Sequence, residues 1–288
     1  MIRLVLNADD SGLTPGVSRA IGGLLSAGAL TDTSLLACGS AFREAVEALR
    51  TAGVTTAGVH LALVGGETPV SDPATVPSLV RGGRFRPSWP AVVAAVAAGR
   101  IRPADVEREW EAQVARVLAS GLAVTHLDGH QHLHLLPRLL PLALALARRF
   151  GIPFVRAPRS DDPAATGSSG LAGTARARLL ALFGGPARKA LARAGFPEPP
   201  RVLGLAEAGR MTAERWVRLL SRLPDDGTWE VVLHPGGDDA ETPARYRWGY
   251  RWPEESEALR GAGFRALLEG RGAVVASFAS LAPGTASS

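Results

Sequence analysis

The sequence predicts an α/β fold with a parallel sheet or barrel. Short runs rich in β-branched and other apolar residues alternate with longer Ala-, Leu- and Arg-rich segments of helical period. Such alternation is typical of repeated strand–helix–strand units. The chain of 288 residues exceeds the usual size of one domain, but α/β barrels of this length share one core. We therefore expect a single domain.

The apolar runs predict strands at residues 3–8, 33–37, 57–61, 123–127, 153–156, 229–233 and 273–278. The segments of helical period predict helices at residues 16–27, 41–52, 103–120, 137–150, 212–223 and 253–269. Three of these helices begin beside a proline, which suits a first helical position because the N–H missing from proline has no partner there. These prolines are Pro103, Pro137 and Pro253.

One segment breaks the alternation. Residues 160–200 open with SDDPAATGSSG and continue as a basic Ala- and Leu-rich stretch. We interpret them as an insertion that covers the substrate entrance or is a mobile excursion, and its amphipathic helix could instead contact a membrane or a partner. The domain is expected to span residues 1–282, and residues 283–288 are expected to be a disordered tail.

Composition and charge exclude several classes of protein. The chain is 46% hydrophobic and 20% charged, which is ordinary for a globular protein. Its net charge is +5, but the basic residues are spread along the chain, and Lys189 is the only lysine. A nucleic-acid-binding protein usually gathers its basic residues into a patch or tract. We therefore expect no nucleic-acid partner.

Cysteine content and hydropathy indicate a cytoplasmic protein. A single cysteine, Cys38, excludes an intrachain disulfide and a thiolate-rich zinc site. The N-terminal MIRLVLNADD lacks the long apolar stretch of a signal peptide. The most apolar stretch, residues 135–147, contains two prolines and is too short to span a bilayer. We expect no stable membrane insertion.

Asp9 and Asp10 follow the first predicted strand, at the end where α/β active sites form. Two like charges this close cannot both be desolvated without a proton or a cation to share. An isolated Asp–Asp pair is more often a helix cap or a turn. The pair therefore needs support from other strands before it indicates chemistry.

Histidines supply that support. Four of the six histidines lie within the segment THLDGHQHLHLLP, at positions 126, 130, 132 and 134, with Asp128 among them. His126, His130 and His134 have helical spacing, whereas His130, His132 and His134 alternate as on a strand. Asp128-Gly129 favours a loop that carries Asp128 and His130 and begins after Leu127.

Polar residues follow the other predicted strands in the same way. His60 ends a strand in GVHLAL, His234 ends one in EVVLHPGG, and Arg156 ends a third. The carboxyl ends of parallel strands meet on one rim. Aspartate and histidine there predict a mixed oxygen and nitrogen site for Zn²⁺, Mg²⁺ or Mn²⁺, which suits hydrolysis. Four alternating aromatic residues could stack on sugar faces or pack the rim: Tyr246, Trp248, Tyr250 and Trp252.

At these residues the sequence resembles the YdjC-like family, whose best understood members are chitooligosaccharide (diacetylchitobiose) deacetylases. The similar segments are NADDSGLTPGVSRAI, LTDTSLLACG, GVHLAL, THLDGHQHLHLLP and VVLHPGG. The resemblance covers most of the chain. It implies a distorted TIM-like (βα) barrel, and it implies hydrolysis of an N-acetyl group from an acetylated amino sugar or chitooligosaccharide.

The resemblance also implies roles for individual residues. Asp10, His60 and His130 would bind the divalent metal. Asp9 would be the general base, His234 the general acid, and Arg156 would orient the base or the substrate. Substrate contacts are expected from a further set: Asp128, His132, Trp248 and Trp252. A homodimer is possible.

Three departures from the family pattern affect the substrate. Ser11 replaces an aromatic residue, Gln131 interrupts a run of histidines, and Ser160 stands where an acid is frequent. A related branch acts on hopanoid-linked sugars and shares the opening motif. The alternatives are a metal-dependent phosphoesterase or glycosidase on the same scaffold, or a non-catalytic sugar-binding protein.

Overall fold

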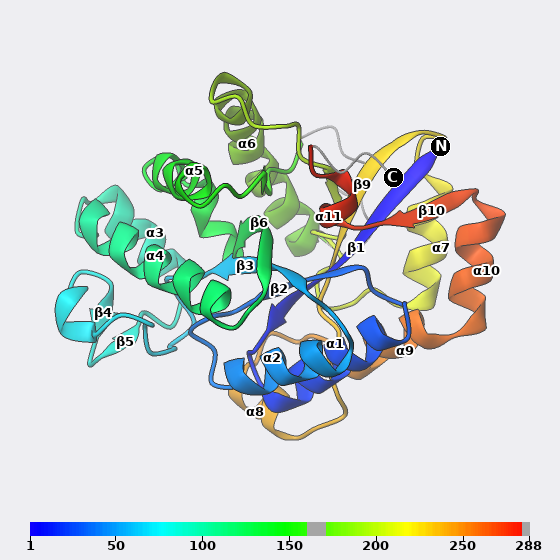
Figure 1. Ribbon diagram of the computed structural model, residues 1–288, viewed down its shortest axis with the longest axis horizontal. Helices are drawn as coiled ribbons and strands as arrows, with labels where there is room; N and C mark the ends of the chain where they lie inside the picture. The colour runs from blue at the N-terminus through cyan, green and yellow to red at the C-terminus, as the bar shows by residue number, and fades with distance from the viewer. Residues whose placement is uncertain (160–170, 284–288) are drawn as a thin grey trace.

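A curled parallel sheet forms half of a barrel at the centre of the molecule (Figure 1). The computed structural model describes residues 1–159 and 171–283, without the side chains of residues 171–181. The strand order is β7-β6-β3-β2-β1-β9-β8, and β10 pairs with the start of β1. The strands are β1 (Ile2–Ser11), β2 (Asp32–Leu35), β3 (Thr56–Leu61), β6 (Ala123–Gly129), β7 (Phe154–Val155), β8 (Arg201–Leu203), β9 (Gly227–Leu233) and β10 (Ala273–Ala276).

Helices surround the sheet (Figure 1). Pairs of helices pack together beside it, α1 against α2, α4 against α5, and α7 against α10. The helices are α1 (Pro15–Ser26), α2 (Phe42–Thr51), α3 (Trp89–Ala97), α4 (Pro103–Ala119), α5 (Leu140–Arg149), α6 (Leu171–Arg193), α7 (Ala213–Ser221), α8 (Glu241–Arg245), α9 (Trp252–Arg260), α10 (Ala262–Gly270) and α11 (Phe278–Leu281). One main core fills the space between the helices and the sheet, and its largest fully buried side chains are Trp110, Trp216 and Trp229.

The seven predicted strands are all present, and the parallel α/β class is confirmed. Three strands were missed because they are too short to show a pattern: β8, and the hairpin of β4 (Val80–Arg81) with β5 (Arg84–Phe85). The helix predicted at residues 253–269 is wrong as a single element. Gly261 has an extended backbone, with φ −75° and ψ 149°, and it divides the segment into α9 and α10.

The helix predicted from Pro137 begins at Leu140, and Pro141 rather than Pro137 lies in its first turn. A 3₁₀ segment, η2 (His130–Leu135), precedes it. Gln131 and His132 in this segment both have a φ of 57°, which bends the chain directly after β6. Residues 130–135 therefore adopt neither a regular α-helix nor a strand.

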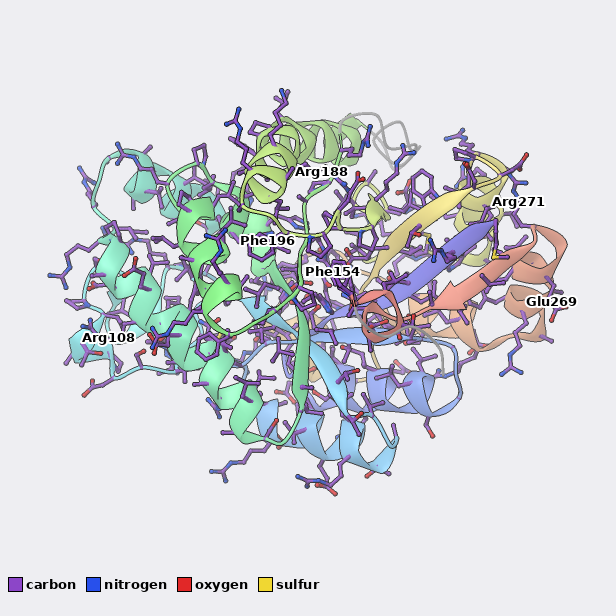
Figure 2. The ribbon with its side chains drawn as sticks, turned by 45° about the horizontal axis from the view of Figure 1, so that its top comes forward. Arg108, Phe154, Arg188, Phe196, Glu269 and Arg271 are labelled. Carbon is purple, nitrogen blue, oxygen red and sulfur yellow. The ribbon has the colours of Figure 1, made fainter. Side chains whose placement is uncertain are left out.

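Within the insertion predicted at residues 160–200, α6 is held against the barrel by Arg188. Its Nε donates to the carbonyl of Ala157, just after β7, at 2.7 Å, and its Nη2 donates to the carbonyl of Pro200, just before β8, at 2.9 Å. Figure 2 labels this arginine on α6, with Phe196 below it. Residues 160–170 lie outside the described residues, as does the predicted tail from residue 284 onwards. Among the described helices, none combines the length and hydropathy needed to span a bilayer.

Candidate functional site

Asp9 and Asp10 lie at the carboxyl end of β1, where the pairing with β2 is irregular. The register shifts between Ala8 and Ser11, and Asp10 has a φ of 64°. This left-handed conformation is uncommon outside glycine, although aspartate adopts it more readily than most residues. Successive side chains of a regular strand point to opposite faces. Because the strand is irregular here, both carboxylates line the same cleft.

The Asp10 carboxylate lies between two imidazole rings. Its Oδ1 is 2.9 Å from Nδ1 of His130 and 3.3 Å from Nε2 of His60. The two rings meet edge to face with 5.4 Å between their centroids, and all three residues are buried. Burial by itself would raise the pKa of Asp10, but the two histidines hold this pKa well below its ordinary value.

These three side chains fit a divalent cation. One potential ligand atom from each lies within 4.8 Å of the others. One carboxylate oxygen and two imidazole nitrogens form a donor set that suits Zn²⁺ and other divalent ions. Asp128 orients His60, because its Oδ1 is 2.8 Å from Nδ1 of His60 and leaves Nε2 directed at the cluster. Burial would lower the pKa of His60, but Asp128 and Asp9 raise it well above its ordinary value.

Arg156 follows β7, and its guanidinium group is completely buried beneath the cleft. Nη1 and Nη2 donate to the two oxygens of Asp9, both at 2.7 Å. Nη2 is also 2.7 Å from Oδ2 of Asp128, and Nε donates to Oε1 of Glu230 at 2.9 Å. Burial alone would lower the pKa of Arg156, but the neighbouring carboxylates of Asp128, Asp9 and Glu230 raise this pKa well above its ordinary value. One cation thus links three carboxylates.

Buried carboxylates outnumber the buried arginine in this region. Of four buried carboxylates here, those of Asp9, Asp128 and Glu230 contact Arg156, and that of Asp10 lies between His60 and His130. Burial raises the pKa of Glu230 to about 7, although Arg156 lowers it. An excess of buried negative charge is relieved by a proton or by a cation. A divalent cation beside Asp10 would offset most of the excess.

His234 follows β9 and lines the same cleft. Glu255 of α9 fixes the turn that carries it: the backbone N–H of His234 donates to Oε1 at 2.5 Å, and the backbone N–H of Met211 donates to Oε2 at 3.2 Å. Burial raises the pKa of Glu255 to about 7. The ring of Tyr250 meets the His234 ring edge to face at 5.0 Å.

The histidine-rich segment divides into cleft residues and buried supports. His130 and His132 line the cleft. His126 lies inside the half-barrel with Nε2 3.0 Å from Oγ of Ser34, and His134 contacts the carbonyl oxygen of Arg156 through Nε2 at 2.9 Å. Burial lowers the pKa of His126 to about 3 and that of His134 to about 4. Both are therefore neutral structural residues.

Asp128 lies within β6 and not on the predicted loop. The ladder with β3 continues beyond Leu127, pairing His60 with Asp128 and Leu61 with Gly129. Asp128 is fully buried, accepts a hydrogen bond from Ser34, and is not part of the cleft wall. The structure therefore places it behind His60, whose Nδ1 it contacts, and its contact with a substrate stays a prediction.

The four aromatic residues of the rim divide into two that line the cleft and two that are buried. Trp248 and Tyr250 line the cleft, and the Trp248 ring is 5.5 Å from the His130 ring. Tyr246 is buried and its hydroxyl donates to Glu67 at 2.5 Å. Trp252 is only 4% exposed and belongs to the core. Of the two tryptophans expected to contact substrate, only Trp248 borders the cleft.

Sequence reasoning missed Glu230 and Glu255. Both are acids in otherwise buried positions, Glu230 inside the apolar strand WEVVLH and Glu255 on the inner face of α9. A charged residue within a buried strand needs a partner of opposite charge. That signal was available for Glu230, and its partner is Arg156.

Fold and site together define the class of protein: an α/β half-barrel with a buried cluster of aspartate and histidine that fits a divalent cation, at the carboxyl ends of its strands. The model of the YdjC-like protein family matches residues 3–270, and the chain belongs to this family.

Similar proteins support this assignment. A Brevibacillus brevis carbohydrate deacetylase is 38% identical over 158 residues, which cover 54% of this chain and 60% of the relative. A Homo sapiens carbohydrate deacetylase is 32% identical over 286 residues, covering 93% and 87%. The alignments with the first three bacterial relatives span about 60% of those proteins. A crystal structure of a candidate cellobiose-phosphate cleavage protein of Enterococcus faecalis is 26% identical, with a TM-score of 0.73 over 97% of this chain and 98% of that chain.

Proposed function

We propose that the protein is a divalent-metal-dependent hydrolase that removes N-acetyl groups from an amino sugar. Relatives named carbohydrate deacetylase support the reaction and the substrate class. The observation that carries the proposal is the convergence of side chains from four strands on one cleft of about 220 Å³. These side chains are Asp9, Asp10, His60, His130 and His234.

Asp10, His60 and His130 would hold the cation. When bound, a divalent cation of this kind lowers the pKa of a water molecule and polarises a carbonyl group. Zn²⁺ or Mg²⁺ suits the donor set, and Mn²⁺ is a third candidate. Asp128 would keep His60 in the tautomer whose Nε2 faces the cluster, because its carboxylate would accept a hydrogen bond from Nδ1–H.

Asp9 would act as the general base. Arg156 fixes the plane of the Asp9 carboxylate through two hydrogen bonds. Oδ1 of Asp9 accepts from Arg156 and from the side-chain amide of Asn7, whereas Oδ2 accepts from Nη1 of Arg156. A carboxylate oxygen has about two lone-pair directions, so Oδ2 retains capacity for a further proton donor. Asp9 takes a proton from the attacking water while the water oxygen forms a bond to the amide carbon.

His234 would act as the general acid. It donates a proton to the amide nitrogen as the carbon–nitrogen bond breaks, so that the products are acetate and a free amine. Glu255 holds the backbone of His234 in place from α9. Trp248 and Tyr250 offer aromatic faces beside the cluster on which a sugar ring can stack.

Acetate release tests the proposal. The purified protein is incubated with N-acetylglucosamine and its oligomers after chelation, and again after addition of Zn²⁺, Mg²⁺ or Mn²⁺. We expect acetate release that chelation abolishes and one of the metals restores. Acetate release that is unaffected by chelation would contradict the metal dependence, and no acetate from any substrate would contradict the deacetylase function.

A further inference from the structure

The cleft extends from the Asp–His cluster along a wall of apolar side chains, which we call the apolar arm. It consists of Trp89 and Val93 of α3, Leu133 and Leu136 of η2 and its C-terminal cap, and Phe183 of α6. Both α3 and α6 pack against η2. Because η2 begins at His130, the arm starts directly beside one of the proposed metal ligands.

The arm offers almost no hydrogen-bonding groups to the hydroxyl groups of a sugar. Among its five side chains only the indole N–H of Trp89 can form a hydrogen bond. Sugar hydroxyl groups that leave water for such a surface lose hydrogen bonds without replacement, which is unfavourable. An alkyl group would instead gain from the transfer. Trp89 is 40% exposed, so a large apolar side chain faces solvent in this part of the cleft. Exposed apolar surface of this kind often marks a binding site.

The position of the proton donor indicates which part of the substrate lies in the arm. An amide has an amine side and an acyl side, and the general acid must reach the amine nitrogen. His234 follows β9, whereas the arm follows β6, and β3, β2 and β1 lie between these two strands in the sheet. Tyr250, a candidate platform for a sugar, contacts His234. The amine side therefore faces β9, and the acyl side faces the arm.

We infer that the apolar arm binds the acyl chain of the substrate, and that the enzyme removes N-acyl groups longer than acetyl from amino sugars. The inference rests on the proposed hydrolase function and extends its substrate class. The reaction balances as before: water adds to the amide carbon, the carbon–nitrogen bond breaks, and the products are a longer carboxylate and the free amine.

The experiment compares N-acetyl-, N-butanoyl-, N-hexanoyl- and N-octanoylglucosamine, with the octyl glycoside of N-acetylglucosamine as the counterpart whose alkyl group is on the sugar oxygen. All are used below the concentrations at which they form micelles. Each methylene group that becomes fully buried strengthens binding roughly fourfold. We expect KM to fall at least tenfold between the acetyl and hexanoyl substrates, with carboxylate release from both.

Variants and a binding measurement make the test specific. Trp89→Ser should remove most of the gain from chain length, and Val93→Ser, one turn further along α3, serves as a second variant. Val217→Ser is the matched control, because Val217 is a 52% exposed apolar residue on α7 that does not line this cleft. Calorimetry of N-octanoylglucosamine binding to the unchanged protein and the three variants after chelation, which stops turnover under the proposed function, reports on the arm separately.

The outcomes separate the two proposals. Acetate release with no gain from longer acyl chains overturns the inference and leaves the deacetylase function standing. A gain for the octyl glycoside alone also overturns it, because the arm would then bind a group on the sugar oxygen. Binding that tightens with acyl length and is lost in Trp89→Ser supports the arm, even if no carboxylate is released and the hydrolase function fails.

Discussion

Arg156 and Asp9 form a completely buried ion pair in which two guanidinium nitrogens contact the two carboxylate oxygens, each at 2.7 Å. The pair joins the end of β7 to the end of β1 across the floor of the half-barrel. A general base must keep a fixed direction. A two-bond contact with arginine provides this property, and lysine cannot reproduce it.

Replacing Arg156 by lysine should therefore impair the base more than the metal site. We expect Arg156→Lys to lower kcat by about 100-fold, because a small misplacement of a catalytic group has an effect of this size. Metal content should stay near that of the unchanged protein. Arg245→Lys is the control, since Nη2 of Arg245 contacts both carboxylate oxygens of Glu67, away from the cleft lining. Equal kcat values in the two variants would contradict the role of Arg156.

Asp128 should act on metal affinity through His60. In Asp128→Asn the contact with Nδ1 of His60 loses its charge, and we expect the metal to bind about 10- to 100-fold more weakly. Competition with a chelator of known affinity measures the change. Asp105→Asn is the control, because it removes the charge of a buried carboxylate away from the cleft. Asp105 accepts a hydrogen bond from the backbone N–H of Ser78 and pairs with Arg102. Unchanged affinity in Asp128→Asn would count against the orienting role.

Glu255 should make stability depend on pH. Burial raises its pKa in the folded protein from 4.5 to about 7. A carboxyl group with a raised pKa contributes stability that is fully present below the unfolded value and is lost as the pH rises through the folded value. Between pH 4.5 and 7 the free energy of unfolding should thus fall by roughly 3 kcal/mol from this group.

Glu255→Gln removes this titration. Chemical denaturation at pH 4.5, 6 and 7.5 should show a shallower pH dependence for the variant than for the unchanged protein, even if the variant is less stable at every pH. Glu254→Gln, at an exposed neighbouring position, should leave the slope unchanged. Identical slopes for the unchanged protein and Glu255→Gln would show that Glu255 is ionised throughout.

Gly58 on β3 should tolerate no side chain. A Cβ built there would lie 2.2 Å from Nε2 of His126, whose ring is completely buried and stacked on Phe278 at 3.9 Å. We expect Gly58→Ala to lower the free energy of unfolding by about 1–3 kcal/mol. Gly23→Ala in α1 is the comparison, because a Cβ there meets no atom within 4 Å and alanine favours the helix. A neutral Gly58→Ala would show that the His126 ring can move.

The sequence predicted the sheet well because strand and helix periods are local properties. The apolar run before Asp9 and the run before His234 each mark the end of a strand without reference to the rest of the chain. The division of residues 253–269 at Gly261 was missed, since glycine also occurs within helices and only packing decides that this one is extended. Asp128 belongs to β6 because it pairs with His60 of β3. These two residues are 68 positions apart in the sequence, so the local pattern around Asp128 does not reveal the pairing.

The candidate site was predictable as a set of residues but not as a network. Strand ends meet at one edge, so the proximity of Asp10, His60 and His130 follows from topology. The three-way contact of Arg156 does not, because Glu230 is separated from it by 74 positions and resembles any strand residue in sequence. Likewise, whether Trp248 or Trp252 borders the cleft depends on how α9 packs, which sequence spacing does not reveal.

The central claim is that Asp9 acts as the general base whereas Asp10, His60 and His130 bind the metal. Measuring metal content together with turnover tests this claim most directly. Elemental analysis and acetate release are determined on the same preparations of Asp9→Asn, His60→Ala and His130→Ala. We predict that Asp9→Asn retains the metal of the unchanged protein and loses turnover, while both histidine variants lose metal and turnover together. Full metal content in both histidine variants would contradict the assignment.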